Sequence, residues 1–322
     1  MRMLRVIEPG MLTLIQDLGR PGLGAIGVAR GGAADSLSLR IGNRLVGNPD
    51  DAPAIEMTML GGSFAFQDDA AIVLTGGRTA AVIIGKDHQR EIAMSCPITV
   101  HAGERLTTGP IVRGVRTYLC IAGGIAVPRV LGSASTHLGA AFGGFHGRAL
   151  RRGDEIPIGE IPAGITPTCT AGAAEMIERM LSSSVLRAVD GSHASEFSAS
   201  LREDFWSRTF TVSARCDRVG IRLVGRIGNE SPHHHGVGAM SSEGMMCGAV
   251  QIPPGGEPII LMVDHPTTGG YPVIACVATV DVPALGQLRP GASVSFERAT
   301  LPASRELFRQ QERELNAQAP FP

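Results

Sequence analysis

Glycine and proline interrupt this chain along its whole length and constrain its fold more than any other feature. The sequence has 42 glycines and 21 prolines among 322 residues. Glycine destabilises helix interiors and proline removes a backbone donor, so both residues shorten regular elements and favour turns. The chain should therefore form many short strands joined by turns, with few helices, and the predicted fold class is mainly β.

Short runs rich in Val, Ile and Leu, each bounded by turn-forming residues, recur along both halves of the chain. The first half predicts strands at 4–7, 12–16, 71–75, 81–84, 98–100 and 116–121. The second half predicts strands at 185–189, 210–212, 221–223, 249–252, 259–263, 273–280 and 293–298. One clear helix is expected over 35–46, because Asp35 is a suitable N-cap and Gly47, Asn48 and Pro49 end the apolar periodicity.

Changes in composition divide the chain into four parts. We expect an N-terminal β domain over 1–165, with its helix near 35–46, and a linker over 166–184 that includes a short helical stretch. A C-terminal β-barrel follows over 185–302. The segment 303–322 should be a polar helical tail that packs only through Leu307 and Phe308 or frays at the end of the chain.

Charge and lysine content exclude several classes of function. Lys and Arg total 29 against 30 Asp and Glu, so the chain has no basic excess for nucleic acid or anionic membrane. No run of about 18 apolar residues is present to span a membrane, and we expect a cytoplasmic protein with reduced cysteines. Lys86 is the only lysine and lies between Gly85 and Asp87, so a P-loop, a biotin-carrying lysine and a Schiff-base lysine elsewhere are excluded.

Two polar clusters in the first half could bind a ligand or could be structural. Gln16, Asp17 and Arg20 follow a strand within five positions, where they could hold a planar or anionic ligand or form a turn with an internal ion pair. Two glycines precede Asp35 at the start of the predicted helix. Backbone amides there could bind an anion, although a capping carboxylate would already use them.

A third cluster lies in the second half, where a buried strand is followed by Asp264, His265 and two threonines. Hydroxyls, amides and a carboxylate at the end of a strand are typical of a binding site at a barrel rim. Glu243 or Asp264 could act there as a general base or hold a magnesium ion. The run 233–235 contains three adjacent histidines, whose side chains alternate in extended backbone, so we expect an exposed loop rather than a metal site.

Taken in order, these clusters resemble the allophanate hydrolase subunit 2 family, also described as biotin-dependent carboxyltransferase-like. The matching segments are 16–20, Asp35 with 43–48, Glu56 before Gly61 and Gly62, 122–125, Asp217 and Arg218 with Gly220, 243–253, and 267–272. Members include the C subunit of bacterial 5-oxoprolinase, the KipA regulator, and part of the carboxyltransferase domain of urea carboxylase. The resemblance covers roughly residues 4 to 300 and implies two cyclophilin-like β-barrel domains with a few short helices.

The resemblance also implies a function, partners and cofactors. It favours a subunit of an ATP-dependent 5-oxoprolinase, a hydrolase that opens the 5-oxoproline lactam to glutamate. Its partners would be a subunit 1 homologue, similar to KipI or to the B subunit of 5-oxoprolinase, and a LamB/YcsF-type protein. ATP with magnesium would act in the complex, and biotin would not be carried on this chain.

One alternative is a carboxyltransferase component that uses carboxybiotin to carboxylate urea or a related amide. Another is a non-catalytic, KipA-like regulator that binds a KipI-like partner.

On these motif positions the resemblance assigns candidate roles. Arg20, Arg218, Glu243 and Asp264 are the candidate catalytic residues, the two arginines for phosphate charge and the two acids for metal or protons. The candidate residues for binding the small-molecule substrate are Gln16, Asp17, Asp35, Asn43, Glu56, Gln251, Thr267, Thr268, Gly269, Gly270 and Tyr271.

Overall fold

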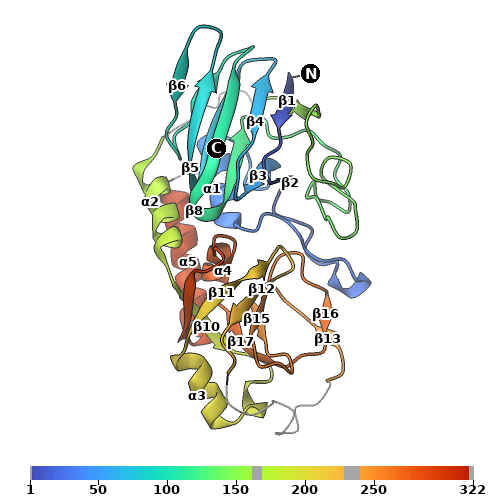
Figure 1. Cartoon of the computed structure of the whole chain (residues 1–322), viewed down its shortest axis with the longest axis vertical. Coiled ribbons are helices and arrows are strands. Elements are labelled where there is room, and N and C mark those ends of the chain that lie inside the picture. The colour runs from blue at the N-terminus through green and yellow to red at the C-terminus, as the bar shows by residue number, and fades with distance from the viewer. Residues whose placement is uncertain (1, 162–168, 228–239, 319–322) are drawn as a thin grey trace. The chain divides into compact units, whose positions relative to one another are not determined.

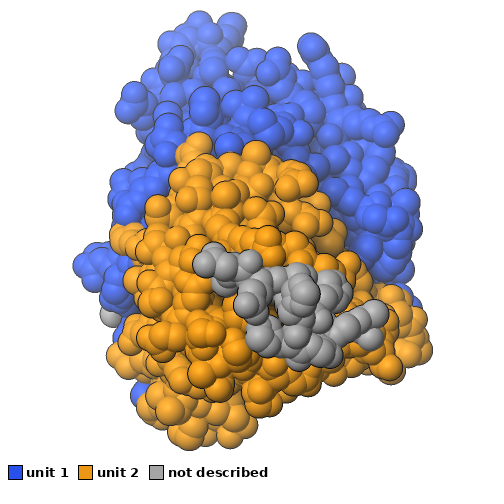
Figure 2. All heavy atoms as spheres, turned by 60° about the horizontal axis from the view of Figure 1, so that its bottom comes forward, with its two compact units in different colours: residues 1–20, 31–181, 313–322 blue, residues 21–30, 182–312 orange. Residues whose placement is uncertain are grey.

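The computed structural model describes residues 2–161, 169–227 and 240–318. The chain divides into two compact units (Figure 2). Unit 1 contains residues 1–20, 31–181 and 313–322, and unit 2 contains residues 21–30 and 182–312. Each unit is mainly β, so the predicted fold class is confirmed. The histidine run 233–235 lies outside the described residues.

Unit 1 is built on a nine-stranded antiparallel sheet. Its central path runs in the order β2-β3-β8-β4-β1-β9, and β5 pairs with β6, β7 and β8. Figure 1 labels β1 to β6 and β8 of this sheet. The strands are β1 (Arg2–Glu8), β2 (Leu12–Gln16), β3 (Ala54–Thr58), β4 (Ser63–Phe66), β5 (Ala70–Ile84), β6 (Gln89–Glu91), β7 (Ile98–Val100), β8 (Arg105–Ile121) and β9 (Glu155–Ile158). The helices are α1 (Ser36–Leu45) and α2 (Ala171–Ser182).

Strands β5 and β8 are much longer than the sequence predicts. The two runs expected at 71–75 and 81–84 are one strand, and the run expected at 116–121 is the end of a strand of 17 residues. The register between the two strands shifts several times between Gly76 and Ala81. Glycine allows such irregularities within a strand, so here it marks bulges where the sequence suggested turns.

The end of β8 is buried on both faces. Leu119 and Ile121 face a core that includes Ile72 and Leu74 of β5. Tyr118 and Cys120, which alternate with them, face a second core, to which α1 and α2 contribute. Because side chains alternate along a strand, a strand covered on both faces appears in the sequence as a continuous apolar run.

Helices that the sequence treated as peripheral contribute to this second core. Ala173, Met176 and Ile177 of α2 are buried in it, although the sequence placed them in a linker. Helix α5 (Leu301–Gln318) contributes Leu315, which is 1% exposed, so the expectation that the tail packs only through Leu307 and Phe308 is wrong. Leu315 is separated from the other large apolar residues of α5 by a polar stretch, so the sequence pattern does not reveal that it is buried.

Unit 2 is a closed barrel in the order β10-β17-β14-β15-β12-β11-β18, and a parallel pairing of β18 with β10 closes it. Its strands are β10 (Val185–Asp190), β11 (Thr209–Cys216), β12 (Gly220–Val224), β14 (Ala249–Gln251), β15 (Ile259–Leu261), β17 (Val273–Val277) and β18 (Ser293–Arg298). A separate two-stranded ribbon pairs β13 (Glu243–Gly244) with β16 (Thr268–Gly269). The helices are η1 (Gly24–Ile26), η2 (Ala194–Glu196), α3 (Ala199–Ser207), η4 (Thr279–Asp281), α4 (Val282–Leu285) and the first part of α5.

Three phenylalanines link α3 to the barrel wall. Phe205 of α3 stacks on Phe296 of β18, with the ring centres 4.8 Å apart, and both rings contact Phe210 of β11. Such contacts add stability beyond the area they bury.

Among the described residues, no helix is both long enough and apolar enough to cross a membrane.

We expect Leu119→Ala to lower the free energy of unfolding of unit 1 by about 2–5 kcal/mol, because Leu119 is fully buried and truncation leaves a cavity. Denaturant unfolding followed by circular dichroism measures this change. Val112→Ala on the same strand is the control, because Val112 is 73% exposed. Equal stabilities of the two variants would contradict the assignment of β8 to the centre of the core.

Candidate functional site

Asp17 is the centre of a buried hydrogen-bond network at the end of β2. Its carboxylate accepts hydrogen bonds from the Gly19 amide at 2.8 Å, the Ser133 hydroxyl at 2.6 Å and the Ala134 amide at 2.7 Å. The Ser135 hydroxyl donates to the same carboxylate. Asp17 therefore fixes the segment 133–135 against the end of β2, and its carboxylate faces protein donors rather than an open surface.

Arg20 and Gln16 hold the same loop. The Arg20 guanidinium donates to the Ser135 carbonyl at 2.6 Å and to the Val130 carbonyl at 3.4 Å, and it lies over the Phe142 ring, 4.8 Å from the ring centre. The Gln16 amide donates to the Thr136 carbonyl at 3.2 Å. Both side chains are at most 2% exposed. The structure thus brings Gln16, Asp17 and Arg20 together as anchors of the loop that follows β8.

Glu56 and Asp35 meet through Tyr118, a residue that sequence analysis did not select. The Tyr118 hydroxyl donates to Glu56 Oε2 at 2.7 Å and accepts from the Asp35 amide at 2.8 Å. The Ala34 amide also donates to Glu56 Oε2, at 3.0 Å. Burial and the nearby Glu56 charge hold the pKa of Tyr118 well above its ordinary value, so this hydroxyl keeps its proton.

Asp35 caps the start of helix α1, and Asn43 lies within the helix. The Asp35 carboxylate accepts from the backbone amide of Ser38 at 2.9 Å, which is the N-cap geometry that the sequence predicted. The Asn43 amide donates to the Ala52 carbonyl at 2.8 Å and tethers the segment that precedes β3. The polar groups of unit 1 that sequence analysis selected therefore bind one another and the backbone, and their roles toward a substrate stay predictions.

In unit 2, Arg218 and Asp264 form a bidentate ion pair. Arg218 Nε lies 2.8 Å from Asp264 Oδ2 and Nη2 lies 3.1 Å from Oδ1, and both side chains are less than 8% exposed. The Asp264 amide also donates to the Arg218 carbonyl at 2.8 Å. Each oxygen of Asp264 accepts from the guanidinium, so this carboxylate is held in a charge-assisted pair.

The β13–β16 ribbon brings the other candidates of unit 2 together. Glu243 is paired with Gly269, and Gly244 with Thr268. The Gln251 amide donates to the Tyr271 carbonyl at 3.3 Å, and a Cβ on Gly269 would lie 2.7 Å from its nitrogen. Glycine at 269 thus permits Gln251 to reach the ribbon. Thr267 joins the ribbon through its carbonyl, which accepts from the Met245 amide, and Gly270 follows β16 directly.

His193 is a residue of this cluster that sequence analysis missed. Its Nδ1 accepts the backbone amide of Val273 at 3.1 Å, so Nε2 carries the proton of the neutral ring. Nε2 lies 3.4 Å from Glu243 Oε1, and the Ser192 hydroxyl lies 3.5 Å from the same oxygen. A single histidine after a strand is not a recognisable motif, and only the pairing of β17 with β10 brings it to Glu243.

Glu243 is the candidate acid whose geometry best suits chemistry. Its side chain is 41% exposed, whereas that of Asp264 is 7% exposed. The Ser192 hydroxyl and the His193 ring lie beside its carboxylate, and a partly exposed carboxylate is a group that can serve as a general base or as a ligand of a cation. Among the described residues, no group of three or more His, Cys, Asp and Glu side chains could hold a metal ion by itself.

The Cys247 thiol interacts electrostatically with both members of the Arg218–Asp264 pair. The pKa of Cys247 is raised to about 11, mainly by burial. The Asp264 carboxylate contributes to this rise, and the Arg30 and Arg218 guanidinium groups oppose it. Since only the thiolate is nucleophilic, a raised pKa keeps this cysteine unreactive near neutral pH.

We expect the alkylation rate of Cys247 by iodoacetamide to rise about tenfold per pH unit between pH 8 and 10, because the thiolate fraction grows until the pH passes the pKa. An unperturbed thiol would level off above a pH of about 9. Mass spectrometry of the peptide that contains Cys247, after timed alkylation of the folded protein, measures the rate. An alkylation rate that stops rising at or below a pH of about 9 would contradict the burial of the thiol.

Tyr118→Phe should lower the free energy of unfolding by about 1–3 kcal/mol, because Glu56 and the Asp35 amide both lose a buried partner. Thermal unfolding followed by circular dichroism measures the change. Tyr271→Phe is the matched control, since Tyr271 is 45% exposed. If Tyr118→Phe were as stable as wild type, the hydroxyl would not be needed to join Glu56 to the start of α1.

Known proteins are similar in sequence to this chain over nearly its whole length. The chain is 35% identical to the C subunit of 5-oxoprolinase from Escherichia coli over 97% of this chain and 96% of that protein. It is 34% identical to the C subunit of 5-oxoprolinase from Haemophilus influenzae over 96% of both chains. Among solved structures, the urea amidolyase of K. lactis matches with a TM-score of 0.87 and 29% identity over 98% of this chain, but the match spans only 20% of that protein.

The family comparison agrees with these matches. The model of the carboxyltransferase domain, subdomain A and B, matches residues 26–298, which include most of both units and all of the candidate residues except Gln16, Asp17 and Arg20. The TM-score of 0.87 shows that the matched part of the K. lactis urea amidolyase has the same fold as this chain, a β-rich unit and a closed barrel. This chain belongs to the carboxyltransferase domain family, subdomain A and B.

Proposed function

We propose that this chain is part of an ATP-dependent 5-oxoprolinase that opens 5-oxoproline to glutamate. The observation that carries the proposal is coverage: the matches to the C subunit of 5-oxoprolinase span 96% of those proteins, whereas the match to urea amidolyase spans 20% of that chain. The chain would act in a complex with a subunit 1 homologue and a LamB/YcsF-type protein, and we propose that the assembled complex, rather than this chain alone, is the hydrolase.

The chemistry of a lactam explains the need for ATP. An amide carbonyl is a poor electrophile, and transfer of the γ-phosphoryl group to the lactam oxygen makes the ring carbon open to attack by water. The first water adds to this carbon, the C–N bond breaks and the ring nitrogen takes a proton, which gives the amine of γ-glutamyl phosphate. A second water then hydrolyses this acyl phosphate, which releases phosphate and glutamate. Positive side chains stabilise the charge of a transferred phosphoryl group, which is the role proposed for Arg218 in this chain.

Glu243 is the residue we propose for proton transfer in this reaction. It is oriented by His193 at 3.4 Å and is partly exposed, so it can reach a bound molecule. A partly exposed carboxylate beside an imidazole is a group that can serve as a general base. Magnesium in such reactions is held mainly by nucleotide phosphates with one or two carboxylates, and Glu243 is the carboxylate of this cluster that fits that role.

The second candidate function is carboxyl transfer from carboxybiotin to urea or a related amide. The observation that favours it is the TM-score of 0.87 to urea amidolyase. Under this hypothesis the biotin is not carried on these 322 residues, because the only lysine, Lys86, lies in a Gly85-Lys86-Asp87 sequence that lacks the context of a biotinylated lysine.

The test is to co-express this chain with its subunit 1 and LamB/YcsF-type partners and to measure glutamate release from 5-oxoproline with and without ATP. ATP-dependent glutamate is the expected result. A purified complex without glutamate release, but with carboxybiotin-dependent carboxylation of urea, would replace the proposal by the second candidate. A complex that catalyses neither reaction would favour a regulatory role.

In the active complex, Glu243→Gln should lower kcat by a factor on the order of 100 or more, because an amide cannot accept the proton. Glu257→Gln is the control, since Glu257 is an exposed acid outside the cluster. Steady-state rates of glutamate release for the two variants measure the effect. A Glu243→Gln complex with the wild-type kcat would remove Glu243 from the reaction.

A further inference from the structure

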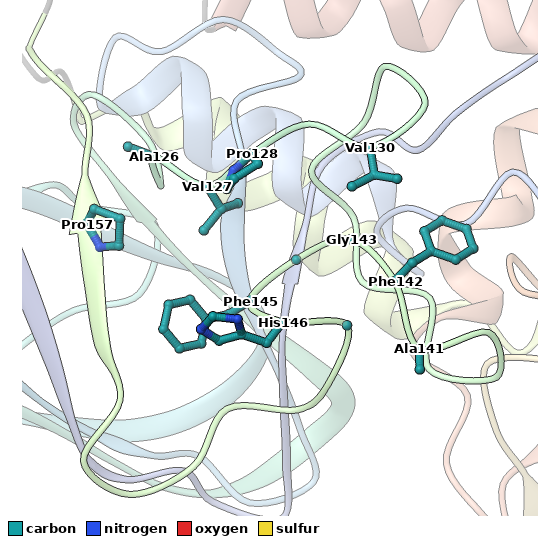
Figure 3. A pocket seen from close by; sticks show the side chains of 12 residues that line it. Ala126, Val127, Pro128, Val130, Ala141, Phe142, Gly143, Phe145, His146 and Pro157 are labelled. Carbon is teal, nitrogen blue, oxygen red and sulfur yellow. The ribbon is translucent and has the colours of Figure 1, made fainter.

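Unit 1 contains a pocket of about 350 Å³ in the loop that connects β8 to β9 (Figure 3). Two segments of this loop, 126–130 and 141–147, form its walls together with Pro157 of β9. Its side chains are Val127, Pro128, Val130, Phe142, Phe145 and His146, along with small residues. Among the described residues that line it, the His146 imidazole is the one titratable side chain, and the volume lies in the range of small-molecule sites.

The backbone of this wall is fixed in an unusual conformation. Ala141 and His146 have φ values of 53° and 59°, in the left-handed region that is unfavourable for residues with a Cβ. Gly143 and Gly144 also have positive φ, and a Cβ on either would lie within 2.1 Å of an atom of Ser135 or Thr136. Strained backbone of this kind persists only where the surroundings enforce it, and it is concentrated at functional sites.

Arg20 connects two walls of the pocket from behind. Its guanidinium donates to the carbonyl of Val130 and lies over the ring of Phe142, and both of these residues line the pocket. The Asp17 network holds the intervening segment 133–135. The buried residues that follow β2 therefore set the width of the pocket without entering it.

A second cation fixes the aromatic wall. The Arg148 guanidinium lies 5.5 Å from the centre of the Phe145 ring and is held by Asp154, with hydrogen bonds of 2.7 and 2.9 Å. The His146 ring packs edge-on against Phe145, with ring centres 4.4 Å apart. Figure 3 shows the Phe145 and His146 rings side by side, with Val127 and Pro128 across from them.

We propose that this pocket binds the flat, uncharged, nitrogen-containing ring of a small molecule. Aromatic and aliphatic walls favour a ring that stacks or packs edge-on, and the His146 imidazole can hydrogen-bond to a polar edge of that ring. The Arg20 and Arg148 guanidinium groups next to the walls already donate to protein oxygens, and none of the described lining residues is acidic. A charged group in the pocket would therefore lose its hydration without gaining a free oppositely charged partner, so the charged part of the ligand lies outside the walls.

Two sources can supply such a ring. The choice of these two sources rests on the proposed function, whereas the pocket itself does not. One is the adenine base of the nucleotide and the other is the lactam ring of the substrate. Adenosine and 2-pyrrolidone are uncharged probes of these two sources. Binding to the full chain is measured directly by ligand-observed NMR and isothermal titration calorimetry, so the result does not require turnover by the complex.

Val130→Trp should fill the pocket and weaken binding of the probe by about tenfold or more. Val112→Trp is the matched control: Val112 is 73% exposed on β8, outside the lining residues, and this variant should bind within about twofold of wild type. His146→Ala, at an exposed position, should weaken binding by roughly threefold to tenfold through loss of one hydrogen bond. Circular dichroism confirms the fold of each variant.

Binding of adenosine alone supports the pocket and identifies a nucleobase site, and binding of 2-pyrrolidone alone supports it and identifies a lactam site. Absence of binding by both probes up to about 10 mM would overturn the proposal, as would wild-type affinity in both Val130→Trp and His146→Ala. A chain that binds a probe while the complex releases no glutamate would retain the pocket and refute the proposed function. A chain that binds neither probe, in a complex that releases glutamate, would refute the pocket and retain the proposed function.

Discussion

The burial of the end of strand β8 on both faces is the constraint from which the architecture of unit 1 follows. Its last residues alternate between two apolar cores, one with β5 and one with the helices. A strand in this position has no face left for water, so a polar side chain on it must find its partner inside the protein. Tyr118 does so by joining Glu56 to the backbone at the start of α1, which ties the sheet to the helix that covers it.

The same principle governs the polar motif after β2, which acts as scaffold. Asp17, Gln16 and Arg20 direct their hydrogen bonds to the loop after β8, more than a hundred residues away. Carboxylate and guanidinium groups with several hydrogen bonds hold backbone more firmly than neutral pairs do, because charge-assisted bonds are stronger. The result is a loop with left-handed residues and a fixed aromatic wall, which is a suitable support for a binding pocket.

Unit 2 combines a rigid and an accessible polar cluster. The Arg218–Asp264 pair is buried and satisfies both partners, so its charges are fixed in place. Glu243 lies on a short ribbon, remains partly exposed, and receives its orientation from His193. Holding one charged group immobile while another can meet a bound molecule is how electrostatic stabilisation and proton transfer are divided in many active sites.

The sequence by itself determined the mainly β character, the positions of most strands, the capped helix after Asp35 and the motifs that indicated the family. These depend on local patterns: alternation of apolar residues, turn residues and a capping side chain. Only the tertiary structure decided that α2 and Leu315 belong to a core, that glycines near 76 bend one long strand instead of ending it, and that His193 meets Glu243. Each of these depends on partners far away in the chain, and local propensity carries no information about which distant residues will meet.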